Sequence, residues 1–231
     1  MHNQTWGFAA FAPGDEIEFV KRDTLLAYAG AKVRTLEMTD DRREQILTLD
    51  RPVPEGVLLE SDVVENITWT PSVDIADCTI ARVPTRGILV TTRRPVRIVG
   101  NRFFRTPMPS ILLEDDAAGW YESGAVRDLL IEGNSFIECA SDAIQIIPQN
   151  SLHQGAVHRN IRIQGNRFLM ATETAISAKS TARLRVNGNY FLVGRKSSER
   201  ELVKTTDSTD VLVEKNKVFE TPDRPPTLRL Q

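Results

Sequence analysis

The sequence has few of the residues that build disulfide frameworks or metal sites. It contains two cysteines, Cys78 and Cys139, and three histidines in 231 residues. Two isolated cysteines make no framework, and neither lies in a metal-ligand spacing, so we expect two buried thiols. His153 and His158 stand five residues apart without a third ligand nearby. The sequence therefore predicts neither a metal site nor a bound cofactor.

Long apolar runs and an excess of either charge are also absent. No apolar run approaches the roughly 20 residues that a membrane helix needs. The opening MHNQTWGF lacks the basic-then-apolar order of a signal peptide, and the cellular compartment stays open. A net charge of −2 and a pI near 6.0 give no case for binding nucleic acid or an anionic membrane.

From residue 72 onward the sequence repeats a pattern of alternating aliphatic residues around an anchor residue. The anchors are Asn101, Asn134, Asn166, Asn189 and Asn216, with Cys78 in the matching slot before them. A phenylalanine or valine stands two residues after each asparagine, and aliphatic residues stand three and five residues before it. Spacing by two within short runs is the β-strand period.

The shortest distance between anchors is 23 residues, which is enough for three short strands but too little to bury a core alone. Stacking such units about 4.8 Å apart buries the aliphatic residues in columns. We therefore predict a right-handed parallel β-helix of about six coils over residues 57–220. At each bend the asparagine side-chain amide would form hydrogen bonds with the matching asparagines of the coils above and below. The glycine that precedes it allows the backbone conformation that the bend needs.

The two ends of the chain do not follow the repeat. Residues 1–56 alternate like half-exposed antiparallel strands and predict a small β-barrel or sandwich. Residues 221–231 carry three prolines and predict an irregular tail. After Asn189, Glu199 and Glu201 fall where aliphatic residues are expected, so we expect the series to end there.

Two anchor spacings are longer, at 33 and 32 residues, and the extra residues follow the third strand of each coil. They are residues 115–126 and residues 148–159. Insertions on one edge of a solenoid are where binding surfaces are usually built. The first insertion opens with Glu114, Asp115 and Asp116 and continues with Trp120, Tyr121 and Glu122.

Glycosidases commonly use two carboxyl groups whose separation sets the stereochemical outcome. Carboxylates one or two coils apart would span the required range. Asp115, Asp116, Glu122 and Asp142 are the in-chain candidates for such a pair. The alternative, solvated loop acids paired with arginines, is equally compatible with the sequence.

The residues beside the third strand are the candidates for binding a ligand. Arg86 and Asp142 share the column two residues before the strand, and Gln145 occupies an outward position within it. Trp120 could stack on the apolar face of a sugar or lock its loop onto the solenoid. For the other arginines between residues 82 and 105 we expect ion pairs with the acids of the next coil.

Three segments, MHNQTWGFAAFAPGDEIEF, RGILVTTRRPVRIVGNRFFRT and SILLEDDAAGWYESGAVRDLLIEGNSF, resemble the C-terminal half of glycoside hydrolase family 110. These enzymes are α-galactosidases that remove α-1,3-linked galactose from blood-group-B-type glycans. The resemblance covers residues 1–220 and implies metal-free hydrolysis with inversion on a β-helix with β-barrel insertions. It also implies an α-galactosyl glycan as partner and export of full-length relatives.

The chain departs from the family pattern at the catalytic strands. Family members carry their acid and base aspartates in a DALHF-like and a DDPINVHG-like strand, both upstream of the segment that resembles MHNQTWGF. Asp142 lies in a similar DAIQI strand several coils further on, so no catalytic residue is carried over.

The resemblance thus implies that this chain completes a substrate cleft without supplying the acid and base. The ligand contacts would be Arg86, Glu114, Asp115, Asp116, Trp120, Glu122 and Gln145. We expect the chain alone to be inactive. The alternative is a non-catalytic β-helix module that binds glycan or forms a structural homo-oligomer.

Overall fold

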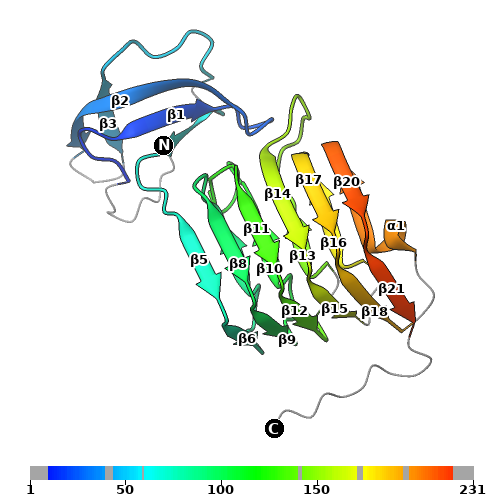
Figure 1. Cartoon of the computed structure of the whole chain (residues 1–231). Coiled ribbons are helices and arrows are strands. Elements are labelled where there is room, and N and C mark those ends of the chain that lie inside the picture. The colour runs from blue at the N-terminus through cyan, green and yellow to red at the C-terminus, as the bar shows by residue number, and fades with distance from the viewer. Residues whose placement is uncertain are drawn as a thin grey trace.

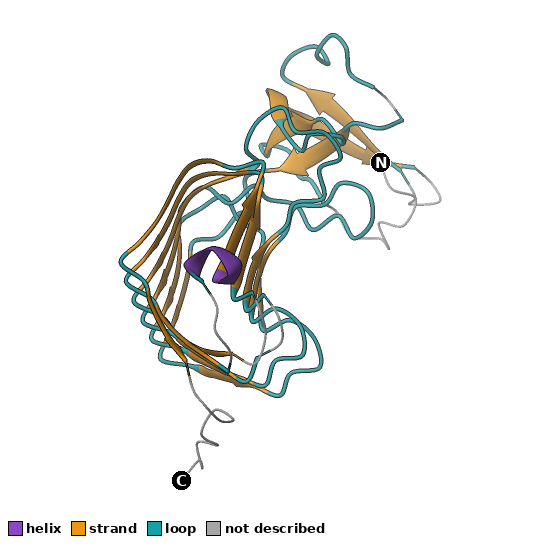
Figure 2. Cartoon of the chain, turned by 90° about the vertical axis from the view of Figure 1, so that its right-hand side faces the viewer, coloured by secondary structure: helices purple, strands orange, loops and turns teal. Residues whose placement is uncertain are grey.

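The computed structural model describes residues 10–39, 44–58, 60–139, 142–170, 174–194 and 198–220. A small antiparallel sheet lies at one end of a long stack of parallel strands (Figure 1). In the view turned by 90° about the vertical axis, three sheets surround a common interior (Figure 2). No helix in the described ranges is long and apolar enough to cross a membrane.

The small sheet contains four strands in the order β3-β2-β1-β4. Their bounds are β1 Glu16–Val20, β2 Ala27–Met38, β3 Gln45–Leu49 and β4 Val63–Asn66. Alternate residues Ile17, Phe19 and Val33 turn inward and pack with Phe11, as period-two patterning requires. Because β4 pairs with β1, the sheet extends past residue 56, where the sequence pattern placed the boundary.

The rest of the chain forms three parallel sheets, and each coil contributes one strand to each sheet. The first sheet contains β5 Val73–Ala76, β8 Val96–Val99, β11 Leu129–Glu132, β14 His158–Gln164, β17 Thr181–Asn187 and β20 Thr209–Glu214. The second contains β6 Thr79–Ala81, β9 Arg102–Phe104, β12 Ser135–Ile137, β15 Arg167–Met170, β18 Tyr190–Val193 and β21 Lys217–Glu220. The third contains β7 Ile88–Val90, β10 Ile111–Leu113, β13 Ile144–Ile146, β16 Ile176–Lys179 and β19 Val203–Thr206. This confirms the predicted β-helix.

The predicted columns form the core of the stack. The matching first-sheet residues Ile98, Ile131, Ile163 and Val186 pair in register and are fully buried. In the second sheet Phe103, Phe136, Phe168 and Phe191 stack with ring centroids 4.9, 4.7 and 4.8 Å apart. Burial of each ring contributes about 2 kcal/mol, so the column is a major source of stability.

The anchor asparagines form a hydrogen-bonded ladder inside the bend between the first and second sheets. The Nδ2 of Asn134 donates to Asn166 Oδ1 at 3.0 Å and to Ile98 O at 2.8 Å. Its own Oδ1 accepts from the Asn101 backbone N–H at 2.8 Å. The preceding glycine, Gly133, has φ +65, a conformation that residues with a Cβ rarely adopt. The ladder therefore satisfies bend groups that burial would otherwise leave unpaired.

The series does not end after Asn189, which corrects the sequence-based expectation. Glu199 and Glu201 lie in a short helix, α1 Glu199–Leu202, and their carboxylates take no place in the core. Leu202 is buried, and Val203 then pairs with Ile176 in the third sheet. The extra residues are absorbed by this helical turn, so a sixth coil follows. Residues 221–231 lie outside the described part of the chain.

Both cysteines are free thiols, but only Cys139 is buried. Cys78 is exposed, contrary to the prediction, because it belongs to the first coil. There it occupies the anchor position of the repeat, and its backbone N–H donates to Asn101 Oδ1 at 2.9 Å. No described strand pairs with the outer edges of β5, β6 and β7, so this coil is one open end of the stack, and β19, β20 and β21 form the other.

Candidate functional site

The predicted ligand-binding residues gather on the outer face of the third sheet and on the two loops that follow its strands. Leu89, Leu112, Gln145 and Ser177 occupy matching outward positions on four neighbouring strands. The first loop (residues 115–126) follows β10. The second loop, predicted over residues 148–159, ends at residue 157 because β14 begins at His158.

The two loops pack against the small sheet and its connections. Leu25 is buried against Ala117 and Ala125 of the first loop and Val157 of the second. The backbone N–H of Leu152 donates to Asp23 O at 2.9 Å. The sequence predicts the loops as a binding edge but gives no sign of these long-range contacts. One side of each loop is thus fixed by the domain interface.

Arg93 reinforces this interface from the β-helix side. Its Nη1 and Nη2 donate to Glu18 at 2.9 Å and to Glu65 at 2.6 Å, both on the small sheet. The arginines were expected to pair with the acids of the next coil, and for Arg93 that prediction is wrong. Arg105 does pair with the next coil, through Glu138 at 2.7 Å, and Arg97 pairs with Asp74 of the preceding one at 3.6 Å.

Arg86, Glu114, Glu122 and Gln149 form one polar network across three coils. Arg86 forms an ion pair with Glu122 of the first loop. Gln149 of the second loop donates to Glu114 Oε1 at 2.9 Å. Burial raises the pKa of Glu114, and the facing Glu122 carboxylate raises it further, while the Gln149 amide opposes the rise. Two carboxyl groups therefore meet beside one guanidinium at the start of the loops.

The aromatic residues of the first loop face solvent. Trp120 is 85% exposed and Tyr121 is 43% exposed, with Tyr121 in the left-handed region at φ 56. An indole ring so exposed does little to lock the loop onto the solenoid. Its face remains available for stacking on the apolar face of a sugar ring.

Asp116 folds the first loop. Its Oδ1 accepts from the backbone N–H of Ala118 at 2.7 Å, and its Oδ2 accepts from that of Trp120 at 2.5 Å. Burial alone would raise the pKa of Asp116, but the backbone donors of residues 118–121 outweigh it and lower the pKa. This carboxylate holds the turn that presents Trp120, and it is only 5% exposed.

Asp115 points into the domain interface. It is 6% exposed, and burial together with the nearby Glu65 carboxylate raises its pKa to about 7, against the opposing effects of the Gly124 N–H and Arg93. Glu65 shares this environment, and burial raises its pKa also, although Arg93 opposes the rise. Asp115 and Asp116 are therefore adjacent in sequence but occupy different sites.

Asp142 lies on the outer face of the third sheet, in a left-handed conformation at φ 53. Its Oδ2 accepts from Ser177 Oγ at 3.0 Å and from Gln145 Nε2 at 3.4 Å. The candidate carboxylates of the sequence are thus divided between the interface, the loop turn, the Arg86 network and this outer face. The described residues contain no group of three or more metal-ligating side chains.

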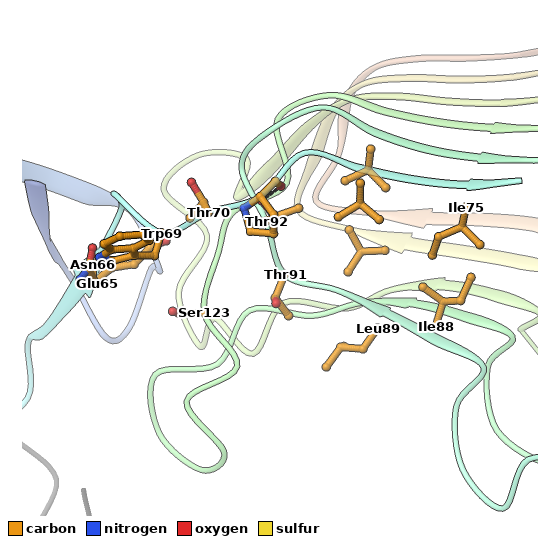
Figure 3. A pocket seen from close by; sticks show the side chains of 14 residues that line it. Glu65, Asn66, Trp69, Thr70, Ile75, Ile88, Leu89, Thr91, Thr92 and Ser123 are labelled. Atoms are coloured by element: carbon orange, nitrogen blue, oxygen red, sulfur yellow. Dashed lines mark hydrogen bonds between the residues drawn. The ribbon is translucent and has the colours of Figure 1, made fainter. Parts of the chain in front are cut away.

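A cavity of about 350 Å³ lies at the first-coil end of the stack, a feature that the sequence did not predict (Figure 3). Interior residues of the first coil, including Ile75 and Ile88, line one side. Glu65 and Trp69 line the other, and Trp69 Nε1 donates to Asp15 Oδ1 at 3.0 Å. The apolar wall of the cavity consists of interior residues of the first coil, which no further described strand covers.

The fold and its loops define a β-helix protein with a polar edge that carries an exposed tryptophan. Residues 1–64 match the family model of the GLAA-B beta-barrel domain II. The chain is 46% identical to alpha-1,3-galactosidase A of Akkermansia muciniphila over 204 residues, covering 88% of this chain and 34% of that protein. It is 42% identical to alpha-1,3-galactosidase A of Bacteroides thetaiotaomicron over 223 residues, covering 94% and 39%. It is 46% identical to that of Streptomyces avermitilis over 198 residues, covering 81% and 32%.

The chain is homologous to a part of the alpha-1,3-galactosidases, glycoside hydrolase family 110, as the resemblance in its sequence predicted. It spans about a third of the length of these curated relatives.

Proposed function

We propose that this chain completes the substrate cleft of an inverting α-1,3-galactosidase that releases terminal galactose. The Arg86, Glu114, Glu122 and Gln149 network carries the proposal, since it joins the two loops beside the outer face of the third sheet. Charged donors and acceptors in a fixed arrangement suit the hydroxyl groups of a sugar. Trp120, on the same loop as Glu122, adds a stacking surface, and Gln145 adds an amide on the adjoining face.

We propose further that the acid and base of hydrolysis come from outside these 231 residues. The DALHF-like and DDPINVHG-like strands of the family have no counterpart in the family position. Asp116 is bonded to its own loop, and Asp115 is buried against the small sheet. Glu122 is paired with Arg86, and Ser177 and Gln145 hold Asp142 on the third-sheet face. Each in-chain candidate is thus buried or held by local partners, which supports an acid and base pair supplied from elsewhere.

The first-coil end of the stack, which contains Arg86, supports the same proposal. Val73, Ile80 and Ile88 are only partly buried although they continue the core columns, as do the partly buried valines of β20 and β21 at the other end. Unpaired strand edges and half-covered aliphatic residues are stabilised when another coil stacks on them. A catalytic coil in this position would stand beside Arg86, which precedes β7 in the first coil. The alternative function is glycan binding without catalysis, which uses the same loops but needs no further coil.

Two assays of galactose release from an α-1,3-galactobioside test the proposal. The chain alone is expected to give no turnover. A chimera in which it replaces the matching segment of the Akkermansia muciniphila enzyme is expected to be active. Turnover by the chain alone that Asp142→Asn or Asp116→Asn abolishes would place the acids within it. An inactive but correctly folded chimera, with binding of the disaccharide by the chain, would favour the binding module.

Within the chimera, Arg86→Ala is expected to lower kcat/KM by about 100-fold, because it leaves Glu122 unpaired and removes a donor to the sugar. Arg97→Ala is the matched control. Arg97 is 58% exposed and pairs with Asp74 on the first sheet, so its loss should change kcat/KM by no more than about twofold. Equal effects of the two substitutions would remove the argument for a site at Arg86.

A further inference from the structure

The outer face of the second sheet carries an arginine cluster that the proposed cleft does not use. Arg82 follows β6, and Arg105 follows β9 one coil further on. The backbone N–H of Arg82 donates to Phe104 O at 3.1 Å, and that of Arg105 donates to Ile137 O at 3.1 Å. Both have left-handed φ values, 54 and 51, so they occupy the same corner of successive coils. Arg102, at the start of β9, is the third member.

All three guanidinium groups gather around one ring. Their Cζ atoms lie 5.8, 5.7 and 4.8 Å from the Phe104 ring centroid, for Arg82, Arg102 and Arg105 respectively. Phe104 is 7% exposed and packs in an outward apolar column with Ile137 and Leu169. The ring is thus a fixed platform on the solenoid. A guanidinium near an aromatic face is attracted to it while its N–H groups stay available for other partners.

The positive charge of this cluster is only partly compensated. Arg105 donates to Glu138 Oε2 at 2.7 Å. Across the described ranges, neither Arg82 nor Arg102 forms an ion pair with a carboxylate, and the Arg102 Nε is buried without a hydrogen-bond partner. The chain as a whole has a net charge of −2, so composition does not explain three guanidiniums around one ring with a single acid. Two of the three guanidiniums therefore lack a carboxylate partner within these ranges, and a bound oxyanion would supply one.

We propose that Arg82, Arg102 and Arg105, held by Phe104, form a binding site for an anionic saccharide, recognised through a sulfate ester or a carboxylate. Planar guanidiniums bind such oxyanions through paired hydrogen bonds, which a neutral sugar cannot replace. The site lies on the second sheet, whereas the proposed cleft lies on the third. It would retain the protein on acidic glycans and does not depend on the cleft being catalytic.

The test is a calorimetric titration of the full chain at low salt with galactose 6-sulfate, galacturonate, inorganic sulfate and galactose. Binding of an acidic sugar at least about tenfold tighter than galactose is expected, since charge-assisted bonds are the strong ones. The Arg82→Gln/Arg102→Gln double variant should abolish that preference. The matched control is Arg162→Gln/Arg185→Gln, which removes the same charge from two arginines that pair with Asp128 and Asp210 on the first sheet. It should leave affinity within about twofold.

Each outcome decides the proposal. The two acidic sugars distinguish a sulfate from a carboxylate ligand. If both double variants weaken the binding of acidic sugars equally, overall charge explains the effect and the proposed site is overturned. Inorganic sulfate binding as tightly as either acidic sugar would overturn its saccharide part. No preference for any anion over galactose would overturn it entirely. Unchanged thermal unfolding of each variant shows that the comparison concerns binding and not folding.

Discussion

At the scale of single residues, Asp115 and Asp116 show how neighbouring carboxyls acquire opposite properties. Asp116 accepts several backbone N–H bonds, which favour its charged form. Asp115 is buried beside Glu65, and both effects disfavour its charged form. The difference arises because alternate residues at the start of the first loop face the turn and the small sheet.

Asp115→Asn is expected to change the pH dependence of stability. The folded pKa of Asp115 is raised from 3.8 to about 7, so its favourable contribution is complete below pH 4 and is lost as the pH rises through 7. This shift corresponds to at most about 4 kcal/mol. Urea unfolding should therefore show the variant gaining stability over the native chain between pH 5 and pH 8. Because Glu65 interacts with Asp115, the midpoint belongs to the pair.

Asp116→Asn provides the opposite control. Its folded pKa is lowered, so its contribution is present above the unfolded value of 3.8 and is lost as the pH falls through the folded value. At pH 8 this variant should be less stable than the native chain. If Asp115→Asn is destabilised as strongly at pH 8 as at pH 5, Arg93 stabilises the Asp115 carboxylate more than burial opposes it.

The sequence located these two residues but not their environments. The sequence predicted a polar insertion, from Glu114 to Glu122, on one edge of the solenoid. The structure brings Arg86, Glu114 and Glu122 together there. The sequence did not indicate Gln149, which the second insertion supplies, or Glu65, which belongs to the small sheet. Contacts between residues 35 or 50 positions apart leave no local pattern, so only three-dimensional packing reveals them.

At the scale of elements, the Asn ladder fixes the register of the coils. Each internal asparagine links its own bend with the bends on both sides. The period of two and the repeated asparagine made these strands predictable. The helix α1 was not predictable in this way, because its Glu199 and Glu201 conflict with the strand period. Glu201 forms a capping box with Ser198 instead, and Glu199 accepts from Asn216 Nδ2.

Asn134→Ala is expected to lower the free energy of unfolding by about 3 kcal/mol, because it leaves buried groups of Asn101 and Ile98 unpaired. Chemical denaturation followed by far-ultraviolet circular dichroism measures the change. Asn216→Ala, in the partly buried last rung, should cost about 1 kcal/mol. Equal losses at the two positions would mean that burial does not set the strength of the rungs.

At the scale of the whole molecule, the first coil presents strand edges and a partly apolar cavity. We therefore expect the chain to associate through this end as its concentration rises. Analytical ultracentrifugation should show the association, and Ile75→Lys should weaken it by placing a charge in the cavity wall. Leu212→Lys, at an exposed position in the sixth coil, is the control and should have no effect. A native chain that stays monomeric throughout the concentration range contradicts the expectation.

The contacts of the two loops with the small sheet have a consequence for recombination among relatives. Ala117 and Val157 share a buried cluster with Leu25 and Val63, so the loops and the small sheet depend on each other's shape. A graft that transfers the first loop alone exchanges half of a packed boundary. Functional exchange of the loops therefore requires that the small sheet travels with them, and natural sequence changes on the two sides of this boundary should be inherited together.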